Sequence, residues 1–86
     1  MTELQHTLRD LHQELSQAQR LAPEDRALLE TVLADIRRVL ETPAEAPSAD
    51  RHGDALEGAA VRLEAGHPGV AGAIRAVLDA LGKAGI

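Results

Sequence analysis

Apolar residues recur along the first part of the chain at the spacing of a helix. Their intervals alternate between four and three residues in the series Leu4, Leu8, Leu11, Leu15 and Ala18. Residues at these intervals share one narrow face of a helix, and such a seam packs along a second helix. Thr2 and Gln5 fit a capping box at its start. The pattern predicts a helix over residues 2–19.

Two later stretches carry broader apolar faces. Pro23, followed by Glu24 and Asp25, is typical of a helix start, and it predicts a helix over residues 23–41. Pro68 predicts another helix over residues 68–84 in the same way. A broad apolar face contacts more than one neighbour, so we expect these two helices to form most of the core.

The middle of the chain contains a linker and a weaker helix. Residues 42–49 include Pro43 and Pro47, which exclude a helix there. Residues 50–65 carry a short apolar stripe, made up of Leu56, Ala59, Ala60 and Leu63. Two glycines, Gly53 and Gly58, weaken this helix by about 1 kcal/mol each relative to alanine.

The four predicted helices define the expected fold class, because no stretch alternates as a strand does. We expect an all-α protein in which residues 1–86 form one helical domain. Its parts would be a hairpin of two longer helices, a proline-rich linker, a short third helix and a C-terminal core helix.

Composition narrows the function classes. The chain has 86 residues, a formal net charge of −5, no cysteine and no aromatic residue. It therefore lacks thiol chemistry, disulfides and aromatic platforms for stacking on bases. A net negative charge disfavours nucleic acid and anionic membranes as partners, because both are negatively charged. With no long apolar run and no signal-peptide pattern, we expect a soluble, cytoplasmic protein.

No motif in the sequence predicts catalysis or metal binding. His6 and His12 are six residues apart and face different ways on a helix, unlike a zinc-binding pair. The glycines at 66, 69 and 72 follow no strand, so helix ends explain them better than a phosphate loop does. We expect no enzymatic activity, no cofactor and no metal, and we expect His67 to help start the last helix.

Protein interaction is the function that the pattern favours. Only 21 residues are Leu, Ile or Val, so the core of a lone chain would be small. Self-association would enlarge this small core by burying apolar surface between chains, so we expect a homo-oligomer. The candidate interface combines the leucine seam with small residues of the last helix: Leu4, Leu8, Leu11, Leu15, Ala73, Ala76 and Ala80.

Two arrangements of the leucine seam stay open. It could pack on residues 23–41 within the chain, or it could also form an interface between chains. The alternative function is an adaptor or regulator that binds a different protein through an apolar helical groove.

Three segments resemble one protein family: residues 8–15 (Leu-Arg-Asp-Leu-His-Gln-Glu-Leu), residues 24–30 (Glu-Asp-Arg-Ala-Leu-Leu-Glu), and the Leu63–Pro68 junction with the C-terminal run 74–86. Together they are similar to the bacterial domain-of-unknown-function 4404 family. The resemblance covers nearly the whole chain except residues 42–54. It implies a small bacterial helical protein, and it implies no activity, cofactor or site.

Overall fold

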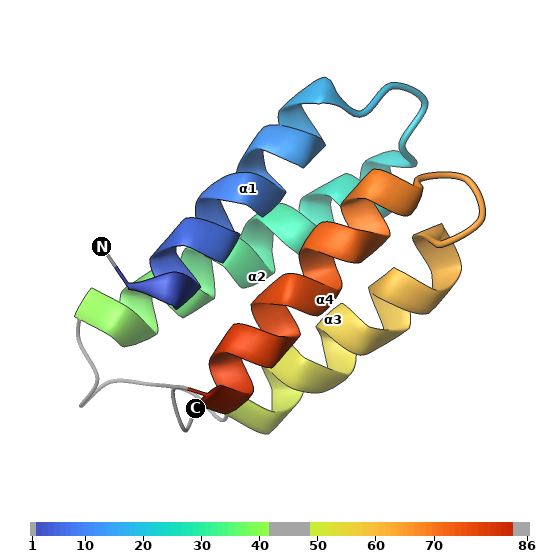
Figure 1. The fold of residues 1–86 in the computed structure, drawn as a ribbon. Helices are drawn as coiled ribbons and strands as arrows, with labels where there is room; N and C mark the ends of the chain where they lie inside the picture. The colour runs from blue at the N-terminus through green and yellow to red at the C-terminus, as the bar shows by residue number, and fades with distance from the viewer. Residues whose placement is uncertain (1, 42–48, 84–86) are drawn as a thin grey trace.

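The computed structural model describes residues 2–41 and 49–83, in which the chain forms four helices (Figure 1). Their bounds are α1 Glu3–Gln17, α2 Pro23–Glu41, α3 Ala49–Leu63 and α4 Pro68–Lys83. No strand occurs in these residues. The expected all-α bundle of four helices is confirmed.

The helices alternate in direction and form a closed ring of neighbours. α1 and α3 run one way, and α2 and α4 run the other (Figure 1). Each helix contacts the helix before and after it in the chain, and α4 closes the ring by packing on α1. The diagonal pairs, α1 with α3 and α2 with α4, make no close backbone approach. This is the up-down-up-down arrangement of a four-helix bundle.

The start of α1 agrees with the local sequence, whereas its end differs from the predicted residue. The Thr2 hydroxyl accepts a hydrogen bond from the Gln5 backbone N–H at 3.2 Å, and the Gln5 side chain accepts one from the Thr2 backbone N–H at 3.1 Å. The predicted capping box is confirmed. The predicted C-terminal end at residue 19 is wrong, because Ala18 is already extended. This early stop lets the chain turn so that Leu21 enters the core, where it is buried.

The other helices begin close to the predicted residues. α2 and α4 start at Pro23 and Pro68, as expected. The His67 carbonyl accepts a hydrogen bond from the Ala71 N–H at 3.0 Å, which places His67 at the start of α4. α3 ends at Leu63, two residues before the predicted end, and a turn follows. Residues 42–48 of the predicted linker and residue 84, the predicted end of the last helix, lie outside the described residues, whereas Ala49 already belongs to α3.

The core is aliphatic and receives side chains from all four helices. Its most deeply buried large side chains are Leu11, Leu15, Leu29, Ile36, Leu56, Ile74 and Val77. α2 and α4 contribute the broad faces that the sequence predicts. Among the described residues no buried side-chain N or O atom lacks a hydrogen-bond partner. None of the helices in the described ranges is both long and apolar enough to cross a membrane.

α4 has the closest neighbours in the bundle. The backbones of α1 and α3 approach α4 more closely than α2 approaches either of them. α1 therefore packs most closely on α4, and it also forms the expected antiparallel hairpin with α2. Small residues explain the difference, because they let helix backbones come together. At Gly69 of α4, an added Cβ would lie 2.8 Å from a Glu14 carboxylate oxygen of α1.

Candidate functional site

The leucine seam predicted as an interface lies inside the chain. Leu4, Leu8, Leu11 and Leu15 are each at most 3 % exposed. Their side chains belong to the common core with α2, α3 and α4. In this conformation they leave almost no surface for a second chain, so any interface must rest mainly on other residues.

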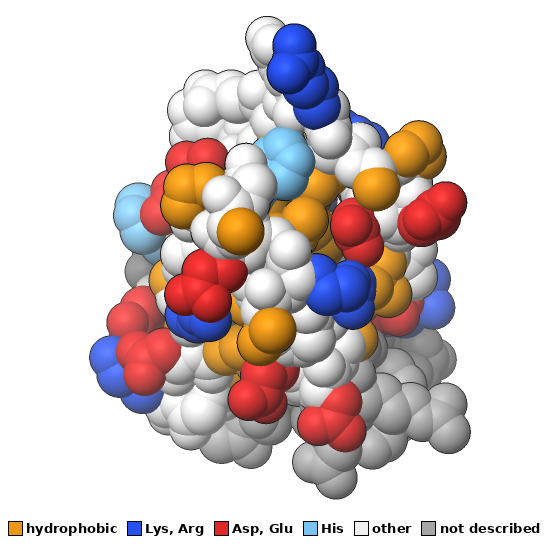
Figure 2. Space-filling model, turned by 90° about the vertical axis from the view of Figure 1, so that its right-hand side faces the viewer, with side chains coloured by type: hydrophobic (Ala, Val, Ile, Leu, Met, Phe, Trp, Pro, Cys, Tyr) orange, Lys and Arg blue, Asp and Glu red, His pale blue; other side chains and the backbone are white. Residues whose placement is uncertain are grey.

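The three alanines of the predicted interface separate into different environments. Ala80 is buried, Ala73 is partly buried against the core, and Ala76 is exposed. Ala76 therefore lies outside the packed faces of α4, whereas Ala71, which is not among the predicted interface residues, is buried. Broad exposed apolar surface is absent from the face shown in Figure 2, where hydrophobic side chains form small groups between acidic and basic ones.

The candidate site is a groove between α1 and α2. One hollow of about 360 Å³ is lined by Gln5, Leu8, Arg9, Arg37, Leu40 and Glu41. A second hollow of about 230 Å³ is lined by His12, Glu30, Leu33, Ala34 and Arg37. Arg37 lines both hollows, so they lie next to each other along the contact between α1 and α2. We call these ten residues the α1–α2 groove.

The groove has an apolar base and a charged rim. Leu8 and Leu33 are buried and close the bottom, whereas Leu40 is only partly buried. Arg9 on α1 and Arg37 on α2 are both exposed. Neither guanidinium forms an ion pair or hydrogen bond with a described residue. The groove thus combines a partly exposed leucine with two arginines that have free hydrogen-bond donors.

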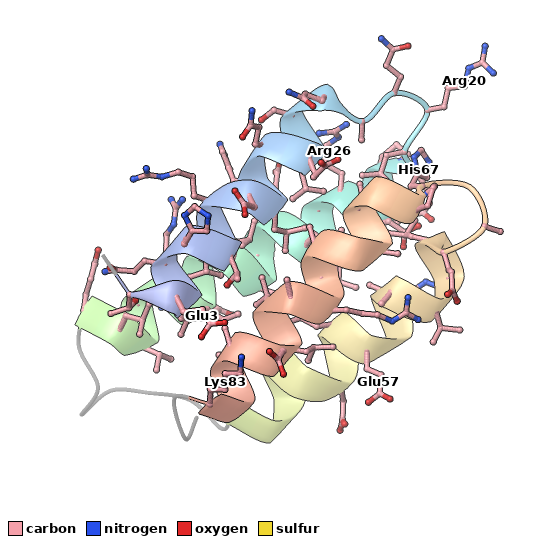
Figure 3. All side chains as sticks on the ribbon, viewed as in Figure 1. Glu3, Arg20, Arg26, Glu57, His67 and Lys83 are labelled. Atoms are coloured by element: carbon pink, nitrogen blue, oxygen red, sulfur yellow. The ribbon has the colours of Figure 1, made fainter. Side chains whose placement is uncertain are left out.

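A third arginine fixes the corner where α1 joins α2. Arg26 donates from Nη1 to the Leu15 carbonyl at 2.7 Å and from Nη2 to the Ala18 carbonyl at 2.9 Å (Figure 3). These carbonyls lie at the C-terminal end of α1, which has no basic residue in its own last turn. Arg26 therefore supplies the positive charge that this end of the helix dipole favours, and it holds one end of the groove.

Ion pairs join the other helix pairs at the surface. Asp25 of α2 pairs with Arg62 of α3 at 3.0 Å. Lys83 of α4 pairs with Asp79 at 3.1 Å and with Glu3 of α1 at 3.3 Å (Figure 3). Hydrogen bonds from Lys83 to Asp79 and then to Glu3, together with their negative charges, hold the pKa of the Lys83 ammonium above its ordinary value. No ion pair joins α1 to α2 among the described residues.

A separate hollow lies where the end of α1 meets the start of α4. It measures about 310 Å³, and its polar lining comes from Glu14, Gln17 and His67. The Glu14 carboxylate lies beside Gly69 in the first turn of α4, where negative charge favours the helix dipole. This contact gives Glu14 a structural role at the start of α4. Within residues 2–41 and 49–83, no group of three or more His, Asp or Glu side chains could hold a metal ion.

Sequence reasoning did not find the groove, because its arginines give no periodic signal. Arg37 and its neighbour Arg38 lie near the end of the predicted helix 23–41, where basic residues are typical because they favour the helix dipole. A signal did exist for Arg26, since a cation in the first turns of α2 is unfavourable for the dipole of its own helix. That mismatch indicates a partner elsewhere, which the structure identifies as the end of α1.

Comparison with known proteins gives a family match. The model of the family described as Domain of unknown function (DUF4404) matches residues 4–86. No curated protein and no solved structure matches the chain.

Proposed function

The chain belongs to this family, and we propose that it is a non-enzymatic protein-interaction module that binds a partner through the α1–α2 groove. The observation that carries the proposal is that one hollow is lined by the partly exposed Leu40 together with Arg9 and Arg37, neither of which has a partner among the described residues. Interfaces between proteins favour such combinations, because an apolar contact supplies affinity and arginine supplies directed hydrogen bonds. A cytoplasmic location stays a prediction from the sequence.

Cross-linking in the cells that produce the protein tests this function. A photoreactive amino acid is placed at Gln5 in the groove, and in a matched variant at Val61, which is 63 % exposed on α3. We expect one defined adduct from the Gln5 position, which disappears when Leu40→Asp is added. The Val61 position should give no such adduct. Equal adducts from both positions, or none from Gln5, would contradict the proposal.

Self-association is the competing proposal, and it would make the chain a homo-oligomer. The small aliphatic core motivates it, but the leucine seam that was its expected interface is buried within one chain. Sedimentation equilibrium at micromolar concentration separates the two. A monomer favours binding of a different protein, whereas a dimer that Leu40→Asp dissociates favours a second copy as the partner.

A further inference from the structure

Four exposed arginines, Arg9, Arg20, Arg37 and Arg38, form no hydrogen bond or ion pair with another described residue, and of these only Arg9 and Arg37 line the groove. Arg26 bonds to backbone carbonyls, and Arg62 and Arg75 pair with the carboxylates of Asp25 and Glu64. Arg9 and Arg37 have no such partner among the described residues, although the chain as a whole carries a net charge of −5. Two unpaired guanidinium groups on opposite walls of one groove favour an occupant with at least two negative groups.

The acidic residues of the groove limit what kind of anion can fit. Glu30 and Glu41 lie on the α2 wall, on either side of Arg37 along the helix. A long polyanion such as nucleic acid would bring phosphates close to both carboxylates, which costs binding energy. A ligand with a few carboxylates at fixed positions can reach the arginines and avoid both glutamates.

The length of the groove along α2 sets the length of an occupant that can line it. The stretch of α2 from Glu30 to Glu41 is about 16 Å long, or three helical turns. A groove between two antiparallel helices accepts a third helix through ridges of side chains. Leu40, which is partly buried, leaves an apolar contact for one side chain of that helix.

We propose that the α1–α2 groove binds a short acidic amphipathic helix of another protein, whose carboxylates pair with Arg9 and Arg37 while an apolar side chain covers Leu40. This inference rests on the proposed function and names its class of partner. Each arginine donates charge-assisted hydrogen bonds to a carboxylate, and together they fix the orientation of the helix.

Selection from a peptide library tests the charge of the partner without assuming its sequence. The library displays helices of about three turns, with outward positions varied among Glu, Lys, Ala and Leu, and the intact chain is the bait. We expect the recovered helices to combine glutamates with leucines at intervals of three, four or seven residues. Recovery of neutral or basic helices, or of none, would overturn the acidic partner.

Charge reversal then tests the two arginines. A recovered helix should bind Arg9→Glu and Arg37→Glu at least tenfold more weakly than the original chain, since a charged hydrogen bond of about 1.5–3 kcal/mol is lost. Arg38→Glu is the matched control, because Arg38 is exposed on the same helix but does not line the groove, and binding should be unchanged. Exchanging the glutamates of the helix for lysines should restore binding to the double variant Arg9→Glu, Arg37→Glu, in which both groove charges are reversed. Equal loss with all three variants would overturn the inference.

The two proposals fail in different ways. If the recovered helices are neutral and bind only when Leu40 is intact, the interaction module stands and the acidic partner is wrong. If no helix is recovered and cross-linking from Gln5 gives no adduct, both are wrong. If sedimentation shows that the chain occupies its own groove, a second copy replaces the acidic helix.

Discussion

The bundle has a closed side around α4 and an open side between α1 and α2. On the closed side, α1 and α3 approach α4 closely, with small residues such as Gly69 and Ala80 on α4. On the open side, α1 and α2 are farther apart, and arginine, glutamate and histidine line the space between them. Both sides share the same core leucines, so apolar burial alone does not explain the difference.

The comparison shows that side-chain size at the helix contact decides which neighbours pack closely. Small residues let two backbones come together and bury the leucine seam of α1. Long polar side chains on α1 and α2 keep the outer edge of that pair open. The same bundle therefore packs closely on one side and leaves a hollowed surface on the other.

Removing a large aliphatic side chain should have the largest effect and should separate the two sides. Ile74→Ala on α4 removes a fully buried side chain, and we expect the free energy of unfolding to fall by about 2–5 kcal/mol. Leu40→Ala in the groove removes a partly buried one and should cost about 1 kcal/mol. Urea denaturation measures both, and equal losses would show that the groove is as tightly packed as the α4 side.

Truncating Arg26 should destabilise the corner that holds the end of the groove. Arg26→Ala leaves the Leu15 and Ala18 carbonyls without their donor, and we expect a loss of about 1.5–3 kcal/mol. Arg26→Lys should recover only part of it, because an ammonium lacks the planar fork of donors. Arg38→Ala is the exposed control and should change thermal stability little. If Arg26→Ala leaves the stability unchanged, the corner forms without this contact.

Enlarging an alanine on each side compares the space available there. Ala59 is fully buried on α3, so Ala59→Leu should overpack the core and cost about 1–3 kcal/mol. Ala34 is exposed in the groove, and Ala34→Leu should stay within about 0.5 kcal/mol of the original chain. The exposed Ala76 should tolerate leucine equally well. Thermal melting tests the three variants, and a large loss at Ala34 would contradict an open groove.

The smallest expected effect concerns the ion pair between α4 and α1. Hydrogen bonds and the charges of Asp79 and Glu3 raise the pKa of Lys83 in the folded chain. The stabilisation is therefore complete below the pKa of an unfolded lysine, about 10.4, and is lost as pH rises through the folded value. Lys83→Gln should remove this ion-pair contribution to stability, while the other effects of alkaline pH on stability stay the same. The original chain should be more stable than Lys83→Gln at neutral pH, and this difference should vanish at strongly alkaline pH; a difference that does not change with pH would contradict the assignment.

The helices were predictable from the sequence because apolar spacing and helix caps are local properties. Pro23, Pro68 and the Thr2 capping box each specify a helix start through neighbouring residues. The choice of α4 as the closest neighbour of α1 was not predictable, since it depends on which small residues meet in space. The early end of α1 likewise depends on Arg26, eight residues beyond the Ala18 carbonyl that it binds.

The groove could not be predicted from the sequence, for a related reason. Arg9 and Arg37 belong to different helices, and their proximity follows only from the antiparallel hairpin. The seam leucines carry the strongest periodic signal in the chain, but that signal reports burial without saying whether the buried contact is within or between chains. In this bundle it is within the chain.

Amide chemical shifts of the isotope-labelled chain test the central claim most directly. The chain is titrated with an acidic helix recovered from the library, and the shifted residues are mapped. The account predicts that shifts concentrate in residues 5–12 of α1 and 30–41 of α2, while the amides of α4 stay in place. Shifts concentrated on α4 and α3 would contradict it, because the partner would then bind the closed side of the bundle.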